Sequence, residues 1–293
     1  MKSNDVVILP EYICDVVLHP LKQLGIKYKF YTLDDALTPK WETMDILVDG
    51  HTKAVMMVHY FGQPQEILAF QKFCEIHSLF LIEDNAHGHG GMFNNQPLGS
   101  FGDIGISSPR KTNSKTISGG VLWFRHNELE PKFYLQTYPV SLGQYIITSL
   151  INPFPKLKYS IKKLLENRPK FENPRAFQES IMPDYSIDTW SKKIIERTKW
   201  NEMCNARQAA YLDWQDIALE NGLRPVFKEL HSESNPWCFP AYVKNHQEAI
   251  KWFDWGWKHN EHVFSWPSLP VEVLERQGES FDRWKRIICF EIL

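Results

Sequence analysis

The stretch Leu79–Gly91 reads LFLIEDNAHGHGG and indicates the fold class of the chain. An apolar run from Leu79 to Ile82 is followed directly by two carboxylates, Glu83 and Asp84, and then by a segment rich in histidine and glycine. A short apolar run that ends in turn-forming residues is typical of a strand buried on both faces. The stretch therefore places a polar cluster at the end of a buried strand.

The first half of the chain repeats this pattern of apolar strands with helices between them. Strands are predicted at Asp5–Pro10, Lys27–Leu33 and Ala54–Gly62, and helices at Cys14–Leu24 and Glu66–His77. This alternation indicates an α/β fold with a mainly parallel sheet and helices on both faces. Because such sheets bind ligands at the carboxyl ends of their strands, His59–Gly62 and Asp84–His87 are expected at one ligand-binding edge.

The second half has a different composition. Two short strands, at Ile104–Ser108 and Val121–Phe124, flank a basic loop rich in hydroxyl groups. Proline, lysine and tyrosine are frequent from about Phe133 to Pro183, which predicts a mobile connector with a helical stretch. Later segments predict a smaller α+β domain, with a helix at Ser191–Gly222, a strand at Trp237–Lys244 and a helix at Gln247–Trp257. The predicted parts are a large α/β domain at 1–135, a connector at 136–190 and a small C-terminal domain at 191–293.

Composition excludes several classes of protein. The chain has 293 residues, of which 43% are hydrophobic and 23% charged, as in ordinary folded domains. A formal net charge of −2 gives no electrostatic reason to expect nucleic acid or a membrane surface as partner. Its five cysteines are scattered and form no CxxC pair, which fits a reducing cytoplasm. No signal peptide and no run long enough to span a membrane is evident, so we expect a cytoplasmic protein.

Three interpretations of the polar cluster follow from the residues alone. A metal site could use His59, Asp84, His87 and His89, although their spacing matches no metal motif with a known mechanism. A hydrolase triad needs a nucleophile on a GxSxG-like turn, which the sequence lacks. Alternatively, Asp84 and Asn85 cap the following turn and the histidines are solvated.

A fourth interpretation rests on the order of several motifs. The sequence contains VHYFGQP from Val58, EDNAHGHGG from Glu83, GSFGDIG from Gly99, and Lys111 eight residues before a GG pair. This order resembles the DegT/DnrJ/EryC1/StrS family, whose members are mostly sugar-nucleotide aminotransferases that depend on pyridoxal phosphate. The resemblance runs from about Val6 to Phe124 and continues weakly into the C-terminal part. It implies an aspartate aminotransferase-like fold (PLP fold type I).

The resemblance also implies a role for each polar group. Asp84 would face the pyridine nitrogen of the cofactor and keep it protonated. Lys111, rather than Lys115, would bind the cofactor covalently, and the family has a Gln or His near the cofactor's phenolic oxygen at the position of His87. Ser107 or Ser108 would bind the phosphate, and no metal is expected.

The implied activity is transfer of an amino group, usually from glutamate, to a nucleotide-linked keto-sugar. Lys111 would move the proton between the donor and the cofactor, and Arg110 could lower the pKa of Lys111 if the two charged groups converge. Family members are usually homodimers, and many act in the synthesis of cell-surface polysaccharides. By this interpretation Glu83 and His89 are only surface or turn residues.

Some features depart from the family pattern. The family has a segment before the position of Asp5, including a helix that binds the cofactor phosphate, so we expect an N-terminally incomplete PLP-binding domain. Cys14 stands where many members have an aromatic ring, and the loop from Gly105 to Lys111 is shorter than the common form. The last strand of related sequences also lies beyond the segment RIICFEIL. The alternative function is therefore an inactive or truncated homologue with a binding or assembly role.

Overall fold

The main sheet contains six strands in the order β2-β1-β3-β4-β7-β8. The computed structural model describes residues 1–126, 128, 134–165 and 184–292. Neighbouring strands run parallel except β7 and β8, which confirms the predicted sheet type. The strands are β1 (Val6–Pro10), β2 (Lys27–Tyr31), β3 (Thr52–Val58), β4 (Phe80–Asn85), β7 (Ile104–Ser107) and β8 (Val121–Phe124).

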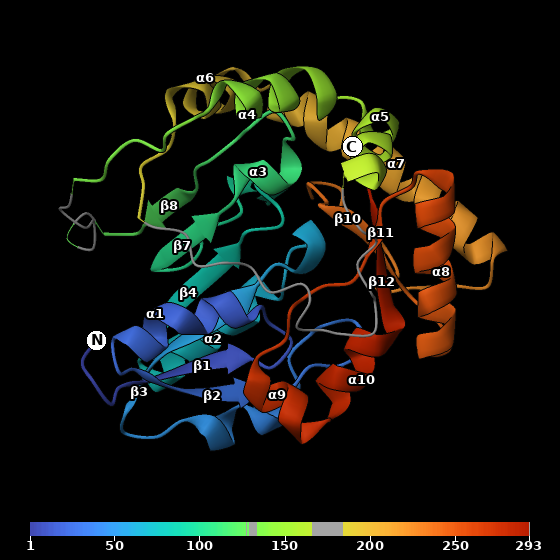
Figure 1. Ribbon diagram of the computed structural model, residues 1–293. Coiled ribbons are helices and arrows are strands. Elements are labelled where there is room, and N and C mark those ends of the chain that lie inside the picture. The colour runs from blue at the N-terminus through green and yellow to red at the C-terminus, as the bar shows by residue number, and fades with distance from the viewer. Residues whose placement is uncertain (127, 129–133, 166–183, 293) are drawn as a thin grey trace.

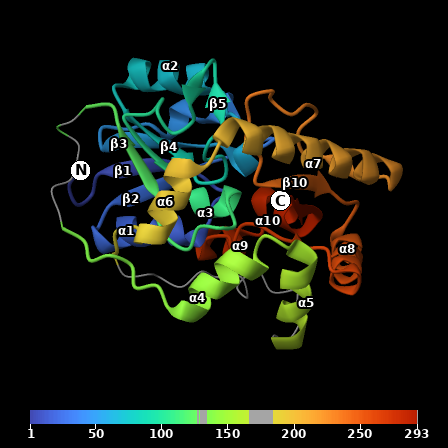
Figure 2. The same ribbon diagram turned by 90° about the horizontal axis from the view of Figure 1, so that it is seen from above.

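Helices cover both faces of this sheet, as predicted. Figure 2 shows α2 on one side of the strands and α1 on the other. This part of the chain contains α1 (Leu18–Gln23), α2 (Ile67–His77), α3 (Pro109–Thr112) and the small ribbon β5 (Met92–Phe93) and β6 (Gln96–Pro97). Helix α1 is shorter than the predicted helix because Asp15–Val17 forms a 3-10 turn, in which the N–H of Asp15 binds the carbonyl of Ser268.

The C-terminal part forms a second, antiparallel sheet in the order β11-β12-β10-β9. Its strands are β9 (Arg224–Pro225), β10 (Cys238–Tyr242), β11 (Val263–Phe264) and β12 (Ile287–Glu291). Its helices are α6 (Thr189–Arg197), α7 (Trp200–Glu220), α8 (His246–His259), α9 (Val271–Arg276) and α10 (Glu279–Arg286). In Figure 1 these orange and red elements lie beside the main sheet. The predicted α+β character of this part is confirmed.

The single helix predicted at Ser191–Gly222 is wrong, because two helices occupy this segment. Thr198 has an extended backbone conformation, with φ −69° and ψ 127°, and ends α6. Its hydroxyl donates to the carbonyl of Ile194 at 2.7 Å and accepts from the side chain of Asn113 at 3.0 Å. A β-branched residue with a competing hydroxyl bond is a weak helix former, and here it joins the break to the loop that follows α3.

The predicted connector contains the expected helical stretch. Its described residues form α4 (Leu142–Ile146), a π-helical turn at Ile147–Ile151 and α5 (Pro155–Leu165). The remainder of the connector, 166–183, lies outside the described residues. The domain limits at 135 and 190 stay a prediction. Among the described helices, none is both long and apolar enough to cross a membrane.

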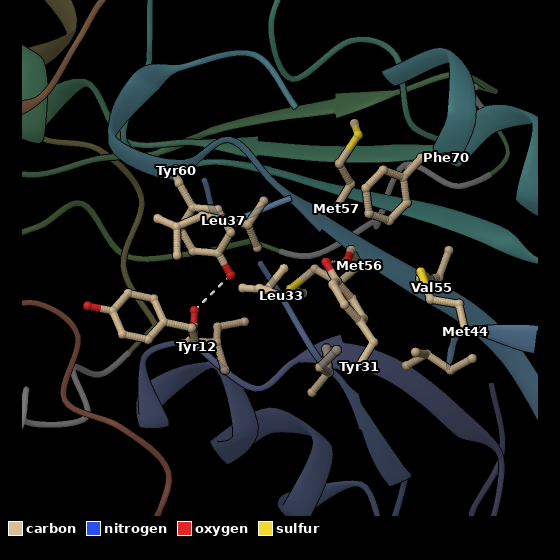
Figure 3. Close-up of a cluster of buried hydrophobic side chains, with 14 of the residues drawn as sticks. Tyr12, Tyr31, Leu33, Leu37, Met44, Val55, Met56, Met57, Tyr60 and Phe70 are labelled. Atoms are coloured by element: carbon tan, nitrogen blue, oxygen red, sulfur yellow. Dashed lines mark hydrogen bonds between the residues drawn. The ribbon is translucent and has the colours of Figure 1, made fainter. Parts of the chain in front are cut away.

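One hydrophobic cluster joins the two sheets. Figure 3 shows its centre, where Tyr12, Tyr31, Tyr60 and Phe70 pack with methionine and leucine side chains of the main sheet. The hydroxyl of Tyr60 donates to the carbonyl of Tyr12 at 2.8 Å, so this buried polar group is satisfied. The same cluster includes residues of β10 and β12. The second sheet is thus held against the edge of the first by a shared core.

Candidate active site

Polar residues gather where β3, β4 and β7 end. His59 follows β3, Asp84 and Asn85 end β4, and Ser107 ends β7. Because the strands are parallel, the register pairs Val58 with Asp84 and Asn85 with Ser107. The predicted ligand-binding edge therefore exists, and the residues come from strands that are neighbours in space.

Asp84 is a buried carboxylate, with 7% of its surface exposed. Its Oδ1 accepts a hydrogen bond from the N–H of Ala86 at 2.8 Å. Burial raises the pKa of Asp84 above its ordinary value, although this hydrogen bond and the charge of Lys111 act in the opposite direction. The carboxylate is thus incompletely compensated, and a cation placed beside it would stabilise it.

Lys111 lies on α3 with its amino group close to the other predicted site residues. Its Nζ is 4.8 Å from the centre of the Trp237 ring, within the range of a cation–π contact. Its positive charge lowers the pKa of both Asp84 and His87. The structure therefore brings Asp84, His87 and Lys111 together, whereas Lys115 is exposed.

His87 is a buried, neutral imidazole. Its Nδ1 accepts a hydrogen bond from the N–H of Phe61 at 3.1 Å, so the ring proton of the neutral form is on Nε2. Burial, followed by the charge of Lys111, lowers the pKa of His87 well below its ordinary value. The ring packs against Trp237 and Trp266, with centroids 4.6 and 4.5 Å away. His87 can therefore offer one N–H donor at a fixed position.

The two candidate phosphate-binding serines differ in their surroundings. Ser107 is buried, and its hydroxyl bonds to Nδ1 of His89 at 2.8 Å. Ser108 is partly exposed and precedes α3, and its carbonyl accepts from the N–H of Lys111 at 3.1 Å. Ser108 has the more accessible hydroxyl, but which serine binds phosphate stays a prediction.

A family model and a relative that aligns along nearly the whole chain show the family. The model of the DegT/DnrJ/EryC1/StrS aminotransferase family matches residues 1–139. GDP-perosamine synthase of Escherichia coli O157:H7 is 30% identical over 303 aligned residues, which cover 97% of this chain and 80% of that protein. The chain belongs to the DegT/DnrJ/EryC1/StrS aminotransferase family.

Other members of the family match over shorter stretches. GDP-4-keto-6-deoxy-D-mannose 3-dehydratase of Escherichia coli O55:H7 is 31% identical over 124 residues, which cover 42% of this chain and 32% of that protein. The matched segments span about a third of the length of several curated relatives.

Solved structures of the family agree with the fold. An aminotransferase of Helicobacter pylori involved in the biosynthesis of pseudoaminic acid superposes with a TM-score of 0.69 at 16% identity, covering 99% of this chain and 75% of that one. The Escherichia coli GDP-4-keto-6-deoxy-D-mannose 3-dehydratase with bound hydrated PLP gives 0.66 at 17% identity, covering 99% and 76%. The predicted fold, that of PLP-dependent aminotransferases, is confirmed.

Pyridoxal phosphate is the cofactor of the DegT/DnrJ/EryC1/StrS family, and the side chains described here fit its groups. The pyridine nitrogen needs a carboxylate, which Asp84 supplies in a buried position where its pKa is raised. The aldehyde needs a primary amine, which Lys111 supplies nearby. The phenolic oxygen is an acceptor, which suits the Nε2–H of His87. The three residues thus match three different groups of the cofactor.

Glu83 is not a surface residue, so that prediction is wrong. It is fully buried, and its two oxygens accept hydrogen bonds from Nε2 of His59 at 2.8 Å and from the backbone N–H groups of Gly99, Phe101 and Gly102 at 2.6 to 2.8 Å. Burial alone would raise the pKa of Glu83, but these donors lower it. The hydrogen bonds of Glu83 therefore hold the loop after β6 against the ends of β3 and β4.

Replacing Glu83 by glutamine is expected to lower the free energy of unfolding by about 3 kcal/mol. The side-chain amide of the glutamine would place N–H donors against backbone N–H groups that bind the carboxylate of Glu83 in the unmodified protein. The shift of the midpoint in urea, measured by circular dichroism, checks this. The matched control is Glu75→Gln, because Glu75 is exposed on α2 and has only a distant contact, 3.9 Å, to Lys72. Equal midpoints for the two variants would contradict the assigned role of Glu83.

His89 lies in a turn, as predicted, but it is only partly exposed and its side chain has specific contacts. Its ring bonds to Ser107 and packs edge-on against Trp200 with centroids 4.5 Å apart, and burial lowers its pKa to about 4. Its carbonyl accepts a hydrogen bond from the hydroxyl of Thr112, the neighbour of Lys111. His89 therefore holds two parts of the site in place.

The histidines and carboxylates of the cluster do not converge on a metal position. His59 bonds through Nε2 to Glu83 and accepts through Nδ1 from the N–H of Gln65. Within the described ranges, no group of three or more His, Cys, Asp or Glu side chains could hold a metal ion.

Trp237 and Arg207 belong to the site but were missed from the sequence. The N–H of Trp237 donates to the carbonyl of Phe61 at 2.9 Å. Buried Arg207 donates to the carbonyls of Pro236 and Trp237 at 2.8 and 2.7 Å, which fixes the indole beside Lys111. No local pattern marks these residues, because α7 and the segment before β10 meet α3 only in the folded chain. Arg110, by contrast, is exposed.

Proposed function

We propose that the chain is a PLP-dependent aminotransferase that moves an amino group from glutamate to a nucleotide-linked keto-sugar. The observation that carries the proposal is the convergence of buried Asp84, neutral His87 and Lys111 at the carboxyl edge of the sheet. When bound, pyridoxal phosphate supplies an electron sink for carbanion chemistry.

Each residue has a distinct task in this proposal. Asp84 holds the pyridine nitrogen in its protonated form, because a buried carboxylate favours a positive charge beside it. His87 donates its Nε2–H to the phenolic oxygen. Nζ of Lys111 would bind the cofactor until the amino group of the donor displaces it, and the freed amine would then take a proton from the α-carbon of the donor and return it on the cofactor side. In the second half of the reaction the same nitrogen moves a proton in the opposite direction. The aromatic rings of Trp237 and Trp266 exclude water around His87.

The substrate class is supported by the names of the relatives. GDP-perosamine synthase and GDP-4-keto-6-deoxy-D-mannose 3-dehydratase are both named for GDP-linked sugars. The presence of a lysine at position 111 favours amino transfer, since this step needs an amine that can bind the cofactor and carry a proton. A role in cell-surface polysaccharide synthesis is part of the same proposal.

Reduction with borohydride tests the covalent role of Lys111. The protein is incubated with pyridoxal phosphate, reduced and digested, and the modified peptide is identified by mass spectrometry. We expect the label on Lys111 and not on Lys115, because only Lys111 lies beside Asp84 and His87. A label on another lysine, or no label, would reject the proposed site and favour a homologue with only a binding or assembly role.

The proposal includes a homodimer in the cytoplasm. Apolar side chains are exposed along α4, the π-helical turn and the start of α5, and Leu142, Leu150 and Phe154 are 76%, 63% and 60% exposed. An exposed row of apolar side chains supports association with the surface of another protein chain. All five cysteines are free, which fits a reducing compartment. Sedimentation velocity tests the assembly, since a species of only 34.4 kDa at micromolar concentration would exclude the dimer.

A further inference from the structure

A cavity of about 1060 Å³ opens beside Lys111. Its walls come from α3 and the loop after it, from the π-helical turn after α4, from the ends of α6 and β12, and from the first turns of α7. Figure 2 shows α3 next to α6, which agrees with the hydrogen bond between Asn113, which follows α3, and Thr198, which follows α6. Lys111 and Trp237 line its inner part. The cavity therefore connects the proposed catalytic lysine to solvent.

The described lining of this cavity is strongly cationic. Seven lysine and arginine side chains line it, against two glutamates, although the whole chain has a net charge of −2. The two glutamates have partners, because Lys199 lies 2.8 Å from Glu202 and Lys158 lies 3.3 Å from Glu291. The guanidinium of Arg207 is bound to two backbone carbonyls. The wall therefore keeps a net positive charge beyond the two ion pairs, and the N–H groups of Arg207 that bind these carbonyls are already occupied.

Three of the cations that contribute to this positive charge are exposed. Arg110 lies on α3, Lys115 on the loop that follows, and Arg197 in the last turn of α6. None of the three forms an ion pair with a residue of the described ranges. Two guanidinium groups and an ammonium group are suited to several phosphate oxygens, because a guanidinium donates two parallel N–H bonds to one phosphate.

Neutral polar residues also line the cavity. Asn113 and Thr198 are joined by a hydrogen bond of 3.0 Å, which links the loop after α3 to the break between α6 and α7. Gln144 and Thr116 belong to the same lining. Amides and hydroxyls of this kind can bind the hydroxyl groups of a sugar. The wall beside Lys111 thus contains neutral polar residues as well as cations.

We propose that Arg110, Lys115 and Arg197 form a subsite for the diphosphate of the nucleotide-linked substrate. The inference rests on the proposed function, and it names the groups that recognise the acceptor. The sugar of the substrate would then extend from this subsite to Lys111. The phosphate of the cofactor is a second source of the same chemistry, and the experiment separates the two.

Calorimetric titration of the protein loaded with pyridoxal phosphate tests the subsite. The probes are GDP and UDP, with guanosine and uridine as uncharged counterparts. We expect the diphosphates to bind and the nucleosides to bind at least about tenfold more weakly, since each charge-assisted hydrogen bond contributes that factor or more. Arg197→Gln and Lys115→Gln should each raise the Kd of the diphosphate about tenfold and leave the cofactor content unchanged. Lys193→Gln, on an exposed position of the same helix outside the cavity, should leave the Kd unchanged.

Two results would overturn this inference. Equal Kd values for the diphosphate in Arg197→Gln, Lys115→Gln and the unmodified protein would remove the subsite. Loss of cofactor from these variants, with no change in diphosphate binding, would assign the cations to the cofactor phosphate. Labelling of Lys111 by borohydride does not depend on either outcome, so failure of the subsite is distinguishable from failure of the proposed function.

Discussion

Lys111→Ala is expected to lower the rate of amino transfer by at least about 10³-fold, the upper part of the range for a positioned acid–base group. Lys111 is proposed both to bind the cofactor and to carry the proton, so one substitution removes two functions. The protein incubated with pyridoxal phosphate should also lose the visible absorption band that a Schiff base between the lysine and the cofactor would give. Amino transfer from glutamate to a GDP-linked keto-sugar and the visible spectrum measure these effects.

Lys115→Ala is the matched control for this variant. Lys115 belongs to the same basic loop but is exposed, and it has no contact with Asp84 or His87. We expect its visible spectrum to match that of the unmodified protein, although its affinity for a diphosphate should fall. If Lys111→Ala keeps the visible absorption band and Lys115→Ala loses it, Lys115 and not Lys111 binds the cofactor.

Asp84→Asn is expected to lower the rate of amino transfer by about 10²–10³-fold, as for removal of one preorganised electrostatic group from a buried site. Asparagine has nearly the same shape as aspartate but carries no charge, so it cannot keep a pyridine nitrogen protonated. The effect should fall on kcat rather than on KM for the sugar, because Asp84 is proposed to contact only the cofactor. Steady-state kinetics with saturating cofactor measures it.

The free energy of unfolding of Asp84→Asn distinguishes the proposed role of Asp84 toward the cofactor from a structural role. The pKa of Asp84 is raised in the folded chain, so the buried charge lowers the free energy of unfolding once the pH has risen through that pKa. Removing the charge should therefore leave the cofactor-free protein at least as stable as the unmodified one at neutral pH. A large loss of stability in urea without cofactor would show that Asp84 supports the fold instead.

The sheet could be predicted because its signal is local. Strands such as β1, β3 and β4 are short apolar runs between turn residues, and burial on both faces removes the alternation that an exposed strand would show. The break at Thr198 could not be predicted in this way, since it depends on a side-chain bond to Asn113 from a loop 85 residues earlier. Propensity alone predicts a continuous helix there.

The candidate site was predictable only in part. Asp84, His87 and Lys111 were chosen from the order of family motifs, and the structure places their side chains together, while their roles stay predictions. The burial of Glu83 could not be predicted, because its carboxylate is bound by three backbone N–H groups of the loop after β6. Adjacent residues of a strand point to opposite faces of the sheet. When both faces are buried, the sequence does not show which hydrogen-bond donors lie on each face.

The parallel sheet, the edge at which polar residues gather, and the family could all be inferred from the amino-acid sequence, because each depends on local patterns or on motif order. The folded chain was needed to see which charged groups are buried, which are paired and which line the cavity beside Lys111. Trp237, Arg207 and Arg197 meet the lysine loop from distant positions in the chain. The pKa of a buried group and the charge of a cavity are sums over such distant neighbours, so they exist only once the chain has folded.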